Sequence, residues 1–291
     1  GYGSLVLLIN DNSGLYEGSI ISCVAIAIIP LIVWLAQHGT IFKPDWKVKT
    51  YATALTFAAL LIPVGTQART GLVCIAVLAL LFIRQTKRRF LYLTGAAVIG
   101  LAAIPFLPSA FSQRMETIQD YKADESAATR VAVWKWTWEF VKEHPFGGGF
   151  DAYRINKIRY DLPVVDENGF DTGAVDRREI VDQGRAYHSS FFEMLGEQGF
   201  PGLIIWLLIH VGGVWRMEMV ARMYKKRNRP DESWVAPLAT ALQNAQIIYL
   251  VGSLFVGIAF QPFVYMLVAM QLGLDTYLAR RRNEAAWTPI R

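Results

Sequence analysis

The sequence predicts an all-α polytopic membrane protein, and three observations support that fold class. Of the 291 residues, 53% are hydrophobic and only 18% are charged, whereas a soluble domain usually carries about 25% charge. The apolar residues are gathered in blocks close to the roughly 20 residues that span a bilayer as a helix. The Lys and Arg residues are concentrated in a few connections between those blocks.

About seven transmembrane helices are expected, because a backbone in lipid must satisfy its hydrogen bonds internally. The blocks are 20–36, 48–65, 70–83, 90–107, 200–220, 236–256 and 260–279. The apolar run at 5–9 is interpreted as the end of another helix, so we expect the C-terminal part of a longer bundle. The two cysteines, Cys23 and Cys74, lie inside blocks and predict neither an external disulfide nor a metal site.

The distribution of basic residues predicts the orientation in the membrane. Of the 29 Lys and Arg, 17 lie in four short stretches within 43–49, 84–89, 216–229 and 280–291. Because short loops rich in Lys and Arg stay in the cytoplasm, threading the helices places segment 108–199 on the periplasmic side. That segment holds 11 Lys and Arg against 16 Asp and Glu. The net charge of +5 therefore indicates orientation in a bacterial inner membrane rather than nucleic-acid binding.

Three parts follow from this threading: helices in 1–107, a periplasmic loop in 108–199 in which we expect the residues of a functional site, and helices with a basic cytoplasmic tail in 200–291. Within the loop, residues 126–144 predict an amphipathic helix at the membrane interface. Its apolar face would consist of Val131, Trp134, Trp138 and Val141. Residues 150–187 are charged and lack periodicity, which predicts an extended loop or lid.

Two residues on the predicted outer face have the chemistry of a site. Ser190 and Glu193 have capping-box spacing, so we expect a short helix from there to Gly199. His188 would precede its positive N-terminus and stay neutral, as a general base for a sugar hydroxyl must. Arg69 lies alone in the short outer turn 66–70, where an ionised group close to hydrocarbon predicts a phosphate site.

Three motifs, in this order and spacing, resemble the O-antigen ligase and polymerase superfamily. They are TQARTG at 66–71, Arg130-x-x-x-Trp134 running into PFGGG at 145–149, and YHSS at 187–190 followed by Glu193 and by glycines at 196, 199 and 202. The resemblance covers roughly residues 15–280 and is closest to the O-glycosylation ligases that accompany exosortase systems.

The resemblance implies a glycosyltransferase (ligase) whose donor is a glycan on undecaprenyl pyrophosphate, with inversion and with no metal or cofactor. It implies that Arg69 holds the pyrophosphate, that His188 is the base and that Arg130 adds a phosphate contact. Arg185 and Tyr187, close to His188 in the sequence, are further candidates for substrate binding. The acceptor stays open between lipid A-core, a protein side chain and another glycan repeat.

Three alternatives remain at this point. A polymerase of the same superfamily needs the same donor site and the same base. A transporter for the lipid-linked glycan would place ionisable groups near the middle of its helices, but the apolar blocks are almost free of charge. A non-catalytic assembly subunit would not need His188. A metal-dependent nucleotide-sugar transferase is disfavoured, because the sequence has no Asp-x-Asp pair.

Overall fold

The computed structural model describes residues 17–66, 68–84, 125–163 and 177–282. The α-helices are α1 (Gly18–His38), α2 (Trp46–Gly65), α3 (Arg69–Arg84), α6 (Glu125–Glu143), α7 (Ser190–Arg227), α8 (Val235–Gly252) and α9 (Pro262–Arg282). Two short 3-10 helices are η3 (Ala152–Ile155) and η4 (Pro230–Glu232), and two strands are β1 (Lys157–Pro163) and β2 (Arg177–Gln183). Six of the seven predicted blocks are helical, while the run at 5–9, the block 90–107 and residues 164–176 lie outside the described residues.

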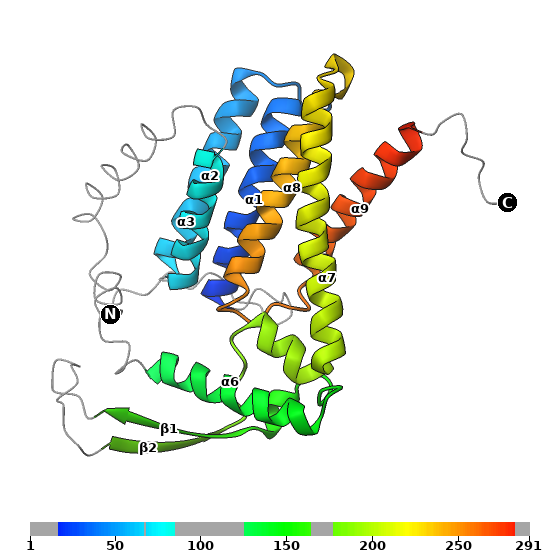
Figure 1. Ribbon diagram of the computed structural model, residues 1–291. Coiled ribbons are helices and arrows are strands. Elements are labelled where there is room, and N and C mark those ends of the chain that lie inside the picture. Colours follow the sequence, from blue (N-terminus) through cyan, green and yellow to red (C-terminus); the bar gives the residue numbers. More distant parts are fainter. Residues whose placement is uncertain (1–16, 67, 85–124, 164–176, 283–291) are drawn as a thin grey trace.

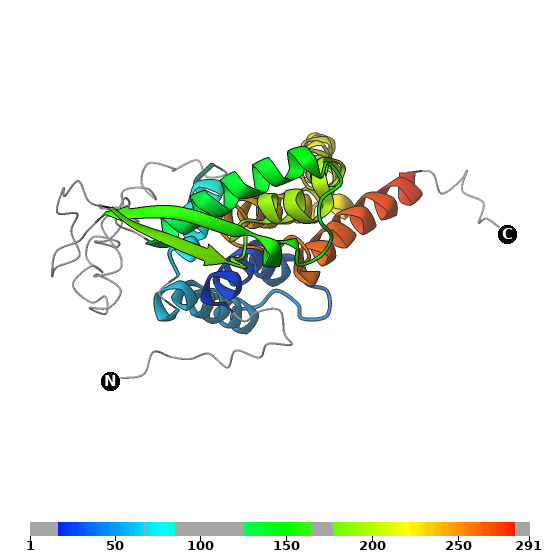
Figure 2. The same cartoon turned by 90° about the horizontal axis from the view of Figure 1, so that it is seen from below.

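Helices α1, α2, α3, α7 and α8 run side by side as a bundle, and α9 leans away from it (Figures 1 and 2). The core lies between α1 and α8, where Cys23 and Ile26 of α1 are buried together with Ile248 and Tyr249 of α8. Three helices of the described part, α1, α2 and α7, are long and apolar enough to cross a membrane. The chain is therefore a mostly helical membrane protein, and seven spans stays a prediction.

The bundle has two chemically different ends, as the charge distribution predicted. The starts of α1, α3 and α7 and the connection 253–261 lie at one end, here called the His188 end (Figure 1). The α1–α2 connection, the end of α3 and the α7–α8 connection lie at the opposite, basic end, which carries Lys43, Arg84, Lys225 and Arg229. The assignment of the basic end to the cytoplasmic side remains a prediction from the distribution of basic residues.

Helix α6 lies across the His188 end, so the helix predicted at 126–144 is confirmed (Figure 2). The predicted apolar face, which was assigned to the membrane interface, is only partly covered by protein. Val133, Thr137 and Val141 are buried, whereas Val131 and Trp138 are 47% and 48% exposed. The hairpin packs against the side of α6 that carries Val133, whereas on the other side Trp134 stacks on Phe192 of α7 and Val131 and Trp138 stay exposed.

The segment predicted as an extended loop contains an antiparallel hairpin, β1 paired with β2, in which Tyr160 lies opposite Ile180. The signal for it was a short alternation, because Ile158 and Tyr160 are buried between the exposed Lys157 and Arg159. Alternation of apolar and polar residues is typical of a half-buried strand, but four residues are few to recognise. The prediction of an extended loop is therefore wrong for the described parts of 150–187.

Candidate functional site at the His188 end

His188 occupies a tight turn between the hairpin and α7. Its φ of 47° is in the left-handed region, which side-chain-bearing residues adopt infrequently. The turn is fixed from α6, where the indole N–H of Trp134 donates to the carbonyl of Tyr187 over 2.8 Å. Trp134 also stacks on Phe192 of α7, with ring centroids 4.9 Å apart. The arginine-tryptophan motif and the histidine motif are therefore neighbours in space.

The start of α7 is fixed from the other side by the connection 253–261. The Ser190 hydroxyl donates to the carbonyl of Val256 over 2.8 Å and accepts from the N–H of Ile258 over 2.9 Å. A Glu193 carboxylate oxygen accepts from the N–H of Ala259 over 2.9 Å. The predicted capping box is thus wrong, because both side chains bind another segment and the N-cap residue, Ser189, makes no side-chain cap.

The surroundings of His188 keep its imidazole neutral. Burial lowers its pKa from the ordinary 6.5, and the positive charges of Arg130 and Arg185 lower it further, while Glu17 raises it. The neutral state agrees with the prediction, but desolvation is the main cause and the predicted reason, the helix dipole, is not needed. Arg130 and Arg185 are therefore grouped around His188, together with an acidic residue at the start of α1.

Arg130 and Arg185 differ in how they are held. The Nε atom of Arg130 is buried and has no hydrogen-bond partner within the described part of the chain. The guanidinium of Arg185 binds Asp182, and its backbone is fixed by Asn156, which accepts from its N–H over 3.0 Å. A buried donor without an acceptor is rare and calls for an explanation, so Arg130 is the better placed of the two for an incoming anion.

Tyr187 lies deeper than the other predicted residues. Its side chain is 3% exposed and packs edge-on against Tyr153, with ring centroids 5.9 Å apart. A Cβ atom on Gly196 would come within 2.4 Å of the Tyr187 hydroxyl, so the glycine makes room for the ring. Burial and the charges of Glu197 and Glu193 raise the pKa of this phenol, which stays protonated. Tyr187 is therefore placed to support the His188 turn from within.

Arg69 is the first residue of α3, at the same end of the bundle. The turn before it is held by Thr66, whose hydroxyl lies 3.1 Å from that of Ser22 in α1. Gly71 packs so closely that an added Cβ would come within 2.6 Å of Pro63. Gly18 touches Thr66 in the same way, and it follows Glu17, whose charge acts on His188. The small residues of the TQARTG motif thus allow α1, α2 and α3 to meet, and the turn lies next to the acidic neighbour of His188.

The two glycine motifs of the sequence meet each other. The N–H groups of Gly148 and Gly149 donate to the carbonyls of Gly196 and Glu197, each over 2.9 Å. Gly199 breaks α7 with a φ of 66°, and a Cβ there would lie 2.0 Å from the carbonyl oxygen of Pro145. The glycines of 145–149 therefore allow the segment after α6 to pack against the break in α7.

Two carboxyl groups, Glu193 and Glu197, lie beneath the site, and the burial of Glu197 was not foreseen from the sequence. Glu197 is 5% exposed and accepts from the N–H of Asp151 over 3.1 Å. Burial raises the pKa of Glu193 and of Glu197 from 4.5 to about 7. Nothing in the sequence around Glu197 indicates burial, because it is buried by the remote turn 145–151. Among the described residues, no group of three His, Cys, Asp or Glu side chains is arranged to hold a metal ion.

The fold and the site define a class of helical membrane protein that carries a neutral histidine and grouped arginines on a structured loop at one end. Residues 54–207, more than half of the chain, match the family described as O-Antigen ligase, and the chain belongs to that family. Residues 1–40 match a family of unknown function (DUF5935). A comparison with curated proteins finds no match. Family membership indicates ligase- or polymerase-type transfer from a lipid-linked glycan in a membrane.

Proposed function

We propose that the chain is a ligase that transfers a glycan from undecaprenyl pyrophosphate to an acceptor hydroxyl at the periplasmic face of the inner membrane. The observation that supports this most directly is the buried Nε of Arg130, which has no hydrogen-bond partner in the described residues, next to the neutral His188. A guanidinium binds phosphate oxygens through a planar set of donors. A neutral imidazole accepts a proton at the same place.

In the proposed mechanism, His188 removes the proton of the acceptor hydroxyl while the acceptor oxygen attacks the anomeric carbon of the donor sugar. The bond between that carbon and the pyrophosphate oxygen breaks, and its electron pair leaves with the pyrophosphate. Attack from the face opposite the leaving group inverts the anomeric configuration. Arg69 and Arg130 stabilise the negative charge that develops on the leaving group, and His188 then returns its proton to water.

The proposal gives Arg185 and Tyr187 lesser parts. Arg185 contributes charge near the donor while it remains bound to Asp182. Tyr187 and the hydrogen bonds of Ser190 and Glu193 to the connection 253–261 hold the His188 turn in place. The hairpin and α6 cover the His188 end, and a covered site limits the access of water, which would otherwise compete as acceptor (Figure 2).

The test expresses the full-length protein with His188→Gln or Arg130→Gln in a strain that lacks the gene, and compares surface glycan on a gel. Each change should reduce glycan attachment by on the order of 100-fold or more, as expected for loss of a general base or of leaving-group stabilisation. The matched controls are His144→Gln, at the exposed end of α6, and Arg84→Gln, at the basic end of α3, and both should retain wild-type transfer.

The same gel separates the proposal from its rivals. Accumulation of long lipid-linked chains supports a ligase, whereas accumulation of single repeat units indicates a polymerase. Wild-type transfer by both site variants, at normal protein level, would contradict the site and favour a non-catalytic subunit. A transporter would instead show lipid-linked glycan retained on the inner side of the membrane.

A further inference from the structure

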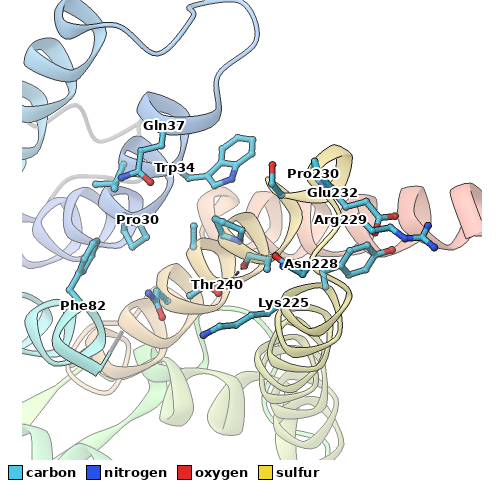
Figure 3. A pocket seen from close by; sticks show the side chains of 17 residues that line it. Pro30, Trp34, Gln37, Phe82, Lys225, Asn228, Arg229, Pro230, Glu232 and Thr240 are labelled. Atoms are coloured by element: carbon cyan, nitrogen blue, oxygen red, sulfur yellow. Dashed lines mark hydrogen bonds between the residues drawn. The ribbon is translucent and has the colours of Figure 1, made fainter. Parts of the chain in front are cut away.

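A cavity lies at the basic end of the bundle, opposite His188. It has a volume of about 690 Å³ and is enclosed by the last turns of α1, α3 and α7, by η4 and by the first half of α8 (Figure 3). Its wall includes Trp34, whose indole N–H donates to the carbonyl of Trp234 over 3.1 Å and ties α1 to the start of α8. The proposed glycan transfer makes no use of this cavity.

The cavity has a positive charge that no described acidic group neutralises. Lys225 extends from α7 towards α8, while Arg229 points to the opposite side at the rim (Figure 3). Neither cation forms an ion pair with a residue that the structure describes. Glu232 is the acidic residue of the lining; its Oε2 is buried without a hydrogen-bond partner among the described residues and lies 3.5 Å from the Nε of Arg227.

A buried amide and the start of a helix also lie at the cavity. Asn244 is 4% exposed and lines the cavity. Helix α8 begins at the cavity without a side-chain cap, because its N-cap residue is Trp234. A buried amide and an uncapped helix start both favour an anionic ligand that supplies acceptor oxygens.

The remaining wall is apolar, with Val33, Trp34, Phe82 and Pro237 beside the polar groups. A small soluble anion would leave these side chains in contact with water. A phospholipid headgroup has the matching combination, a phosphate followed by a glycerol and the start of its acyl chains. A cavity of this volume is in the range that holds a ligand of that size.

We propose that this cavity binds the phosphate of an acidic phospholipid headgroup at the membrane surface, with Lys225 and Asn244 as ligands. This site is independent of the proposed glycan transfer, since it lies at the other end of the bundle. The bound lipid joins α1, α3, α7 and α8 and therefore stabilises the folded bundle by mass action.

The test measures the unfolding temperature of the purified full-length protein in a neutral detergent with dioctanoyl phosphatidylglycerol, dioctanoyl phosphatidylcholine or inorganic phosphate. Phosphatidylglycerol should raise the unfolding temperature, and the other two should leave it unchanged. Lys225→Gln should weaken the apparent affinity about fivefold to tenfold, because one cation near an anionic headgroup is lost. The matched control is Lys226→Gln, which removes the same charge one residue away and does not line the cavity.

A second variant tests the lipid site without changing any charge. Asn244→Leu keeps the size of the side chain and should also weaken the response to phosphatidylglycerol without lowering protein yield. Equal loss in the Lys226→Gln control would overturn the proposal in favour of unspecific attraction. An equal response to inorganic phosphate would show a site for a soluble anion instead, and the absence of any response to phosphatidylglycerol would also refute the lipid site.

Discussion

At the scale of single residues, the charges around His188 set the pH range in which it can act as a base. Because its pKa is lowered from 6.5, the neutral form persists below that pH, and transfer should be lost as the pH falls through the lowered pKa. Arg185→Gln removes a charge that lowers this pKa, so the acid limb should move to higher pH. Glu17→Gln removes a charge that raises it, so the acid limb should move to lower pH.

The measurement is the rate of glycan transfer at saturating donor as a function of pH, with the full-length enzyme. The two shifts should be on the order of half a pH unit in opposite directions. A merely structural effect of either substitution would reduce the rate at every pH and leave the midpoint in place. Midpoints that both move in one direction would contradict the assignment of His188 as the base.

Some residues of the site could be identified from the sequence alone, and others could not. Arg69 and His188 could be selected because each departs from its surroundings, one as a lone charge between apolar blocks and the other just ahead of a helix. The burial of Glu197 could not be selected, because the turn that covers it is 46 residues away from it at Asp151. Ser190 and Glu193 were recognised as important, but their partners lie in a segment more than 60 residues further on.

At the scale of elements, the break in α7 at Gly199 connects the helical turns beside His188 to the part of α7 that packs in the bundle. Gly199→Ala should destabilise the protein and abolish transfer, because the new Cβ would lie 2.0 Å from the Pro145 carbonyl at a φ of 66°. Gly212→Ala is the matched control on the same helix, where a Cβ meets nothing within 4 Å. It should be neutral or stabilise the helix by up to about 1 kcal/mol.

These two variants are compared by their unfolding temperature in detergent and by their transfer activity. If Gly199→Ala folds and transfers normally, the close contact between 145–149 and the break is not required.

Helix positions were predictable here because hydropathy and proline or glycine stops are local signals. The hairpin β1–β2 was not recognised, since its alternation is limited to Ile158 and Tyr160 on one strand.

At the scale of the whole molecule, the sorting of charge anticipated the arrangement better than any motif did. The basic stretches and the predicted site residues lie at opposite ends of the bundle, as the threading required (Figure 1). The arrangement follows from the sequence because an up-and-down bundle alternates its connections between two sides. The cavity at the basic end was not predictable, because its lining comes from α1, α3, α7, η4 and α8 together.

The orientation of those two ends is open to a direct measurement, since the two cysteines of residues 1–291, Cys23 and Cys74, are both fully buried. They should not react with a membrane-impermeant maleimide in intact cells. Lys157→Cys in the exposed part of β1 should be labelled through the periplasm, whereas Lys226→Cys should be labelled only after the membrane is permeabilised. The reverse pattern would place His188 in the cytoplasm and contradict both the predicted topology and the proposed periplasmic transfer.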